Sequence, residues 1–250
     1  SDVSILAIPG IAGLQPTLKS LKISKKILIA NKESVICGWD LINKYKKKYK
    51  VKIFPVDSEH FSIMNMLNKT NKKNIEKIYL TASGGPFLNY PLKMMKNIKP
   101  AQAINHPKWK MGKKISVDSA TMMNKVFELI EAKNIFKLSL QNLKILVHRD
   151  SYLHAIVKFK NGITKMIIHD TDMKIPIFGT LNFNEKYFKK LNDLDLKKIN
   201  NLNLHLPNTN KYPLIKILKK LPKKFSLFET VLVATNDKLV DLFLKKKIHY

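Results

Sequence analysis

The segment HPKWKMGKKISVDSATMMNKVFE, residues 106–128, places a histidine, a tryptophan, serines, lysines, an asparagine and a glutamate around one predicted helix start. Asp118 or Ser119 is expected to cap this helix, which would run to about Ala132. Apolar residues at helical spacing predict that one face packs on a core, which leaves the polar face for a cleft. An ordinary capped amphipathic helix is the plainer interpretation of this segment taken alone.

The two faces of the predicted helix differ in chemistry. Successive residues lie about 100° apart around a helix, so the spacing assigns each side chain to a face. The polar side carries Asn124, Lys125, Glu128 and Glu131. The apolar side carries Met123, Phe127 and Ile130. Ser119 adds a hydroxyl at the helix start, where free backbone N–H groups attract anions. An amide, an ammonium and a carboxylate could therefore face one cleft.

A second polar segment, PVDSEH at residues 55–60, follows a predicted strand. Residues two apart in an extended chain share a face, so Asp57 and Glu59 could reach one cation. A third carboxylate, from Glu128, would leave coordination positions for substrate oxygens or water. Ligation by oxygen alone suits Mg²⁺ or Mn²⁺ and does not suit structural zinc. A solvated turn, or a helix cap at Asp57, is the alternative for this segment alone.

Three further segments offer groups for small-molecule binding. Ser83-Gly84-Gly85 follows a predicted strand and is a candidate phosphate nest, although a plain turn is more common. Asn31-Lys32-Glu33, at another strand end, could hold a nucleotide or a substrate hydroxyl, or simply cap a helix. His106 and Trp109 could form a mobile flap with the indole as its lid, or a packed loop. Two other histidines are expected to be structural: His148 and His154.

The composition is that of a folded protein. The 250 residues are 45% hydrophobic, and no apolar run reaches the roughly 18 residues of a membrane span. Cys37 is the single cysteine, which excludes an internal disulfide and favours a reducing compartment. The net charge of +28 would suit nucleic acid, but Arg149 is the only arginine and the lysines are spread along the chain. We interpret the charge as a general drift toward lysine, and predict neither a nucleic-acid nor a membrane partner.

The order of the predicted elements indicates an α/β protein. Strands are predicted at residues 3–8, 26–30, 50–56, 76–82, 145–148, 155–159 and 164–168. Helices are predicted at residues 16–21, from 31 onward, at 119–132, at 212–220 and at 228–244. The first three strands alternate with helices, which favours a parallel sheet whose ligands sit beyond the strand ends.

Together these segments resemble the 1-deoxy-D-xylulose 5-phosphate reductoisomerase family of the non-mevalonate isoprenoid pathway. The matching segments, in the family's order, are NKES at 31–34, PVDSEH at 55–60, LTASGGPF at 80–87, the whole of 106–128, Asp172-Met173 with Pro176, and Lys211-Tyr212-Pro213. The resemblance spans nearly the whole chain. It implies an NADPH-dependent oxidoreductase that rearranges 1-deoxy-D-xylulose 5-phosphate and reduces the product to 2-C-methyl-D-erythritol 4-phosphate, with Mg²⁺ or Mn²⁺ as metal.

The resemblance also implies roles for single residues. The metal ligands would be Asp57, Glu59 and Glu128. The substrate contacts, several at the phosphate, would be Lys32, Ser58, Glu59, Ser83, His106, Trp109, Ser119, Asn124, Lys125 and Glu128. The catalytic residues would be Lys32, Asp57, Glu59, His106 and Glu128. The NADPH contacts would be Asn31, Glu33 and Gly112.

The resemblance divides the chain into four parts. These are a remnant of a Rossmann-like NADPH-binding domain at 1–57, an α/β catalytic domain at 58–182, a linker at 183–210 and a partial C-terminal helical domain at 211–250. The family's glycine-rich dinucleotide fingerprint and its last helices are not in this sequence. The chain is therefore expected to be a fragment, or a shortened lineage, that binds phosphate better than NADPH. The family implies a homodimer in the bacterial cytoplasm or a plastid-type organelle.

Departures from the family pattern are few. They are Val126 in place of a usual glycine, Arg149-Asp150 after His148, and Thr235-Asn236-Asp237 in the last helix. We expect them to affect packing or dimer contacts more than chemistry. Two alternatives to the reductoisomerase are a metal-dependent sugar-phosphate lyase or phosphatase without hydride transfer, and a nucleic-acid-binding protein supported by charge alone.

Overall fold

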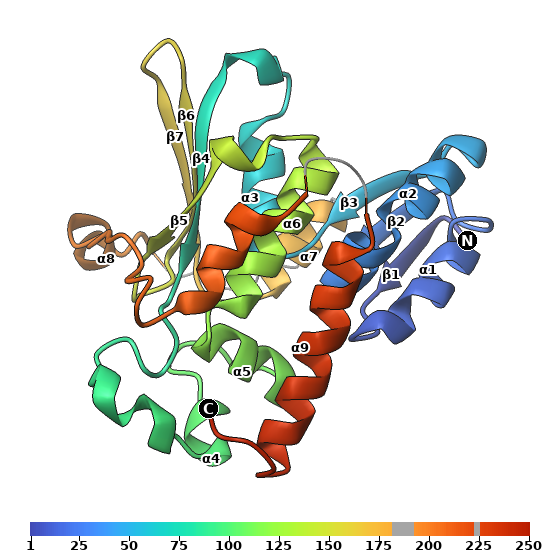
Figure 1. The fold of residues 1–250 in the computed structure, drawn as a ribbon. Coiled ribbons are helices and arrows are strands. Elements are labelled where there is room, and N and C mark those ends of the chain that lie inside the picture. Colours follow the sequence, from blue (N-terminus) through green and yellow to red (C-terminus); the bar gives the residue numbers. More distant parts are fainter. Residues whose placement is uncertain (182–192, 223–225) are drawn as a thin grey trace.

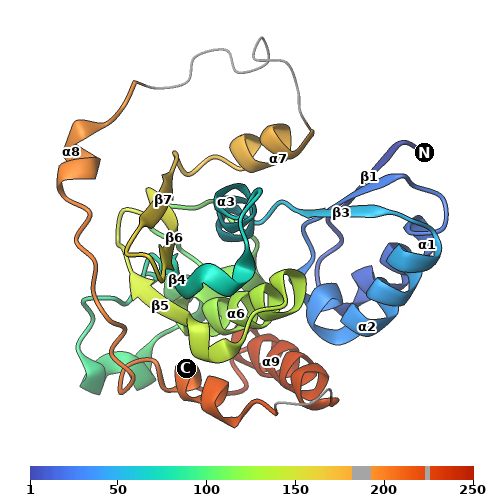
Figure 2. The same ribbon diagram turned by 90° about the horizontal axis from the view of Figure 1, so that it is seen from above.

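The structure, a computed structural model, describes residues 1–181, 193–222 and 226–250. Two β-sheets form its framework, and the helix α6 (Met123–Phe136) lies between them in both ribbon views (Figures 1 and 2). The predicted α/β class is confirmed. Of the predicted linker, residues 183–192 lie outside the described residues.

The first sheet is parallel, in the order β1 (Val3–Leu6), β2 (Lys26–Ile29) and β3 (Lys52–Pro55). Helices α1 (Leu14–Ser20) and α2 (Lys32–Lys48) follow the first two strands, as the alternating pattern predicts. Three successive residues of β2 are fully buried: Ile27, Leu28 and Ile29. Burial on both faces is typical of a central parallel strand. The carboxyl ends of β2 and β3 lead directly to the predicted site residues at 31–33 and 57–59.

The second sheet is mixed, in the order β5 (Leu143–Val147), β4 (Ile75–Ala82), β6 (Leu153–Phe159) and β7 (Thr164–Ile168). β4 pairs parallel with β5 and antiparallel with β6, and β6 and β7 form the predicted hairpin. The helices α3 (Ser58–Met66) and α6 pack against this sheet and close a core around Ile78 and Leu80. The end of β4 thereby points toward the start of α6.

The helix predicted from Asp118 or Ser119 is wrong in its start. The segment forms two helices, α5 (Lys113–Ala120) and α6, and Gly112 stands at the N-cap of α5. Met122 separates them in a left-handed conformation, with φ of 64°, and its side chain is buried in the core of the second sheet. Burial of this side chain outweighs the cost of the left-handed backbone, which local periodicity cannot reveal.

The C-terminal part covers α5 and α6. The helix α9 (Phe228–Leu244) matches the predicted bounds and runs beside α5 toward α2 (Figure 1). The helix predicted at residues 212–220 is a 3-10 helix at Pro213–Lys220. Val126, at a departure from the family pattern, is fully buried in a core shared by α6 and α9. The remaining helices of the described residues are α4 (Pro100–Ala103), α7 (Lys174–Leu181) and α8 (Leu196–Asn200), with 3-10 turns at 11–13, 72–74, 92–97 and 140–142.

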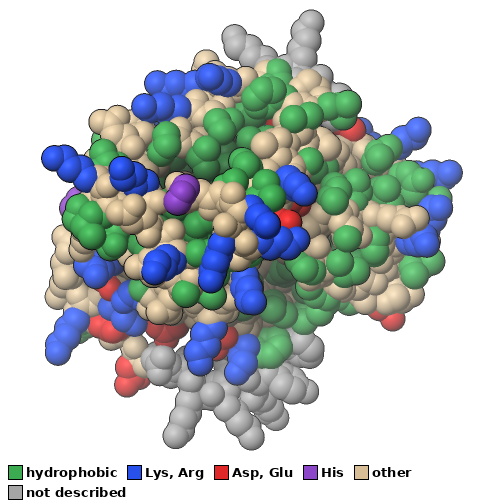
Figure 3. Space-filling model, turned by 60° about the horizontal axis from the view of Figure 1, so that its bottom comes forward, with side chains coloured by type: hydrophobic (Ala, Val, Ile, Leu, Met, Phe, Trp, Pro, Cys, Tyr) green, Lys and Arg blue, Asp and Glu red, His purple; other side chains and the backbone are tan. Residues whose placement is uncertain are grey.

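Helix length and the distribution of charged side chains were compared with what a membrane span or a basic patch requires. Among residues 1–181, 193–222 and 226–250, none of the helices has the length and apolar character needed to cross a bilayer. On the face shown in Figure 3, lysine side chains are spread among apolar and acidic ones.

Candidate active site

One cleft of about 250 Å³ lies where the strand ends of both sheets meet the start of α6. It is lined by all the substrate and metal residues that the family resemblance implies: Lys32, Asp57, Ser58, Glu59, Ser83, His106, Trp109, Ser119, Asn124, Lys125 and Glu128. The three predicted NADPH residues do not line it: Asn31, Glu33 and Gly112. The fold thus gathers into one cavity groups that are up to 96 positions apart in the sequence.

Three carboxylates converge in this cleft. Asp57, Glu59 and Glu128 each place an oxygen within 4.8 Å of the others. The route to this convergence differs from the prediction, because β3 ends at Pro55 and Glu59 lies in the first turn of α3. Asp57 occupies the N-cap position of that helix, which was the alternative for this residue. The start of α3 and one face of α6, and not the alternation of an extended strand, bring the three groups together.

Two buried lysines balance most of this negative charge. The Lys125 ammonium is 2.6 Å from Glu59 Oε1 and also contacts Glu128. The Lys32 ammonium is 3.1 Å from Asp57 Oδ2, and it donates a hydrogen bond of 2.7 Å to Asn124 Oδ1. With all groups ionised, three carboxylates face two ammonium groups. The remaining negative charge, held out of bulk water, favours a further cation.

The three acids are not equivalent. Burial raises the pKa of Glu59 to about 8, and the neighbouring charge of Glu128 acts in the same direction. Burial would also raise the pKa of Asp57, but the Lys32 ammonium holds it well below its usual range. At neutral pH Asp57 is therefore ionised, and Glu59 carries a proton for much of the time.

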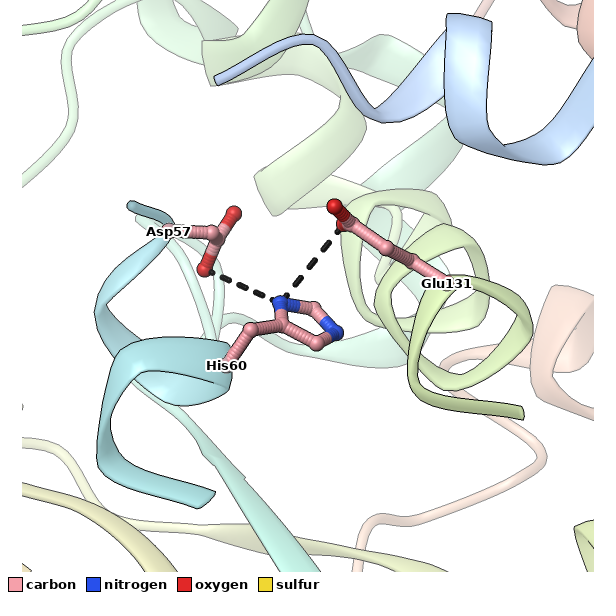
Figure 4. Close-up of side chains that lie close together, drawn as sticks. All are labelled: Asp57, His60 and Glu131. Atoms are coloured by element: carbon pink, nitrogen blue, oxygen red, sulfur yellow. Dashed lines mark ion pairs between the residues drawn. The ribbon is translucent and has the colours of Figure 1, made fainter. Parts of the chain in front are cut away.

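His60 is buried next to the carboxylate cluster and lies close to two acidic side chains. Its Nδ1 lies 3.6 Å from an oxygen of Asp57 and 3.6 Å from one of Glu131, as Figure 4 shows. Its Nε2 is 2.9 Å from the backbone oxygen of Glu128. The ring therefore joins α3 to α6 at the level of two of the three cleft carboxylates.

Glu131 does not face the cleft, although its helical position predicted that it would. Its side chain is 1% exposed and points to His60. Sequence reasoning gave His60 no role. Had the 57–60 segment been recognised as a helix start, the spacing of three residues would have placed His60 on the face of Asp57.

The predicted phosphate nest forms a tight turn against the end of α5. Gly84 and Gly85 both have positive φ, of 84° and 65°. A Cβ on Gly85 would lie 2.9 Å from Ala120 Cα and 3.0 Å from Ser119 O, so this turn and the last turn of α5 touch through their backbones. Ser83 Oγ accepts a hydrogen bond of 3.1 Å from the Gly85 N–H. The hydroxyls of Ser83 and Ser119 thus lie on adjoining backbone turns of one cleft.

The predicted flap residues His106 and Trp109 lie in residues 105–112, which contain neither helix nor strand, and His106 contacts the Ser83 turn. His106 Nδ1 accepts hydrogen bonds from the backbone N–H groups of Lys108, at 3.2 Å, and Trp109, at 2.9 Å. Nδ1 therefore bears no proton, and Nε2–H donates to Ser83 Oγ at 2.9 Å. Burial lowers the pKa of His106 to about 4, so the ring is neutral at pH 7.

Two contacts hold the rest of this segment. The indole of Trp109 meets the His154 ring edge to face, with 6.4 Å between centroids. The Lys108 ammonium is 2.9 Å from Asp150 Oδ1, and both side chains are partly exposed. Asp150 is one of the departures from the family pattern, and here it contacts the flap.

Two of the predicted NADPH residues, Asn31 and Glu33, directly follow β2 of the first sheet. The Asn31 amide donates to the backbone oxygens of Ile8 and Gly10, and its Oδ1 accepts from Ser34 N at 2.6 Å, so it caps α2. Gly10, which follows β1, has φ of 73° and open space where a side chain would be. This edge of a parallel sheet is where nucleotides commonly bind.

Other residues of the cleft were not predicted. They include Thr81, Ser151, His154 and Met173. His154 borders the cleft, yet its Nε2 bonds to the His169 backbone oxygen at 3.0 Å and the two rings stack at 3.6 Å. His148 is buried and bonds to the Leu202 backbone oxygen at 2.7 Å, as suits a structural residue. Met173 belongs to a segment that matches the family pattern, but no function was predicted for it.

An α/β scaffold whose strand ends gather carboxylates, ammonium groups and hydroxyls in one cleft is typical of enzymes that bind a cation and a small anionic substrate together. Three family models match the chain. They are described as 1-deoxy-D-xylulose 5-phosphate reductoisomerase at residues 1–38, its C-terminal domain at 53–136, and the DXP reductoisomerase C-terminal domain at 168–250. The chain therefore belongs to the 1-deoxy-D-xylulose 5-phosphate reductoisomerase family.

Relatives and solved structures agree with this family. The reductoisomerases of Pelagibacter ubique and of a Sulfurihydrogenibium species are 57% and 43% identical over all of this chain. A crystal structure of DOX-P reductoisomerase with NADPH, fosmidomycin and magnesium is 36% identical over 99% of the chain, with a TM-score of 0.88. The enzyme from Zymomonas mobilis in complex with NADPH is 34% identical over the whole chain, with a TM-score of 0.86. The chain spans 64% and 65% of the two relatives, and 63% and 64% of the two structures.

Proposed function

We propose that the full-length protein containing this chain converts 1-deoxy-D-xylulose 5-phosphate to 2-C-methyl-D-erythritol 4-phosphate, with NADPH and with Mg²⁺ or Mn²⁺. The observation that carries the proposal is the meeting of three carboxylates with the hydroxyl, amide and ammonium groups of one cleft. The family supplies the substrate and the reaction. Solved relatives contain NADPH and magnesium according to their descriptions, which supports the same cofactors here.

The cluster of Asp57, Glu59 and Glu128 fits a hard divalent cation. Its donors are oxygens only, and they lie within 4.8 Å of one another. A bound cation would supply Lewis-acid stabilisation of negative charge on the substrate oxygens. Lys32, 3.1 Å from Asp57 in the same cluster, and Ser58 at the start of α3 are proposed to hold the substrate hydroxyls.

The part of the cleft next to this cluster is proposed to bind the phosphate. Its groups are the hydroxyls of Ser83 and Ser119, the amide of Asn124 and the ammonium of Lys125. His106, neutral and with its proton on Nε2, is proposed to contact the substrate from the flap. Trp109 beside it would exclude water from the reacting carbons.

NADPH is proposed to lie along the carboxyl edge of the first sheet, near Asn31, Glu33 and Gly112. The open positive-φ turn at Gly10 supports this edge as a place where a cofactor backbone can approach closely. The side-chain amide of Asn31 is already engaged inside the protein. We therefore expect the backbone of Asn31, and not its side chain, to contact the cofactor.

Metal affinity is expected to rise with pH. Because the pKa of Glu59 is raised to about 8, a proton occupies this carboxyl at neutral pH, and a cation must displace it. Because one bound proton must be released, the apparent affinity falls about tenfold for each pH unit below the pKa. Calorimetric titration with Mn²⁺, in buffers of different ionisation enthalpy, should show release of a proton at neutral pH. A constant affinity between about pH 6 and pH 8 would contradict this assignment.

Absorbance of the reduced nicotinamide tests the proposed reaction. The full-length protein is mixed with the sugar phosphate, Mn²⁺ and NADPH, and oxidation is expected only when metal and substrate are both present. Replacing the substrate by its dephosphorylated sugar is the matched control, because it removes only the group proposed to bind Ser83 and Ser119. Metal-dependent turnover that leaves NADPH unchanged would favour a lyase or phosphatase instead.

The remaining features of the whole protein are proposed on the same basis. We propose that the protein is a homodimer. We also propose that it is located in the bacterial cytoplasm, because the relatives described above are bacterial. β7 lies at the edge of its sheet, and Met166 on this strand is 52% exposed, which leaves apolar surface for a second copy. We propose a boundary between the cofactor-binding part and the catalytic part at residues 57 and 58, between β3 and α3.

A further inference from the structure

Lys114 joins three helices that otherwise belong to different parts of the molecule. Its ammonium lies 2.9 Å from Glu33 Oε1 on α2, 2.9 Å from Asp118 Oδ2 on its own helix α5, and 3.1 Å from Asp237 Oδ1 on α9. Asn236, also on α9, donates a hydrogen bond of 2.8 Å to Asp118 Oδ1. One lysine thus connects the cofactor side, the helix after the flap and the C-terminal helix.

This network is largely shielded from water. The side chains of Asp118 and Glu33 are 3% and 10% exposed, and that of Lys114 is 29% exposed. Although burial opposes the charged ammonium, the pKa of Lys114 is raised because Asp118 and Glu33 face it. Without this lysine, the carboxylates around it would face one another in surroundings that screen charge poorly. The three helices, of which α2 and α5 also pack on α9, would then lose their common ion-pair partner.

The network lies next to segments that are proposed to bind the cofactor and the substrate phosphate. α5 begins at residue 113, directly after the flap, and ends beside Ser119 of the proposed phosphate site. Glu33 is a proposed NADPH contact in the first turn of α2. Neither Lys114 nor the two α9 residues line the cleft. The α9 residues were expected to matter for packing, and the structure places them against Asp118 and Lys114.

We propose that Lys114 is a positioning residue that holds Glu33 in place for the nucleotide cofactor and couples this edge to α9. The proposal rests on the proposed function for its kinetic part and on the observed contacts for its structural part. It predicts that the C-terminal helix influences cofactor affinity from outside the cleft.

The test uses the full-length protein with Lys114→Met, which keeps most of the length of the side chain and removes its charge. Calorimetry is expected to show about tenfold weaker binding of NADPH, while the KM for the sugar phosphate stays unchanged. Lys114→Arg keeps the positive charge and is expected to restore most of the affinity. Asp237→Asn, a milder change at a partly exposed side chain, is expected to weaken NADPH binding in the same direction.

The matched control is Lys245→Met. This lysine forms an ion pair of 2.9 Å with Asp241 on α9, but its side chain is 65% exposed and lies away from the network. Equal NADPH affinity in wild type and Lys114→Met would overturn the proposal, as would parallel losses in the binding of both substrates.

Hydrogen exchange separates this proposal from the proposed reaction. In Lys114→Met, faster exchange is expected at residues 32–38 and at residues 228–244 together, whether or not the protein oxidises NADPH. Unchanged exchange in either segment would remove the coupling. If wild type neither binds nor oxidises NADPH, the proposed function fails, while the exchange result still decides whether Lys114 couples the helices.

Discussion

Replacement of Glu128 by glutamine is expected to lower kcat by about a hundredfold to a thousandfold while the protein remains folded. Glutamine has nearly the same volume and can still bond to Asn124, which contacts Glu128 Oε1 in the structure. It removes one of the three carboxylates, so at most two negative charges would face the two neighbouring ammonium groups. The cluster would then lose its net attraction for a cation. Steady-state kinetics at a series of Mn²⁺ concentrations measure the effect.

The matched control for this variant is Glu229→Gln. Glu229 is also a poorly exposed glutamate, at 10% for its side chain, and pairs with Lys133 at 3.0 Å, but it lies on α9 and does not line the cleft. It is expected to keep wild-type kcat. If Glu128→Gln retained near-native kcat at low metal concentration, the proposed metal site would be incorrect.

A second large effect is expected from Gly85→Ala, in stability and in substrate binding together. Gly85 has φ of 65°, where an L side chain costs about 1–2 kcal/mol. The added methyl would also lie 2.9 Å from Ala120 Cα and 3.0 Å from Ser119 O, and such backbone atoms cannot rotate away. Overpacking adds about 1–3 kcal/mol, so a total loss of roughly 3 kcal/mol in the free energy of unfolding is expected. Relief of the clash would displace Ser119 and raise the KM for the sugar phosphate.

Gly162→Ala separates the two costs. Gly162 lies in the hairpin turn with φ of 88°, but nothing lies within 4 Å of the added methyl. It is expected to lose about 1–2 kcal/mol, from backbone strain alone, with unchanged kinetics. Urea unfolding of both variants gives the comparison. Equal losses at the two positions would show that the contact of the Gly85 turn with α5 is looser than the structure indicates.

The sequence predicted best those elements that are determined by residues close together in the chain. The strands, the hairpin and α9 follow from apolar runs and turn residues, and the same segments supplied the groups of the cleft. The break at Met122 could not be predicted, because the periodicity continues through it and a tertiary core decides its conformation. For the same reason Ser119 was expected at a helix start and lies in the last turn of α5.

Contacts between distant buried groups were also beyond the sequence. Glu131 has the spacing of a cleft residue, and only the packing of α3 on α6 turns it to His60. Lys114 looks like any lysine of a basic chain until α2 and α9 bring Glu33 and Asp237 to it. The chain has a net charge of +28, and a few of its lysines are buried and paired with carboxylates.

The chain carries two tryptophans, and the fold sets them in different surroundings. Trp39 packs in the core of the first sheet, whereas Trp109 belongs to the flap and faces His154. Substitution of Trp39 by phenylalanine would leave a single indole emitter at the mouth of the cleft. The colour and intensity of its fluorescence would then test in real time whether the flap closes, without any added dye.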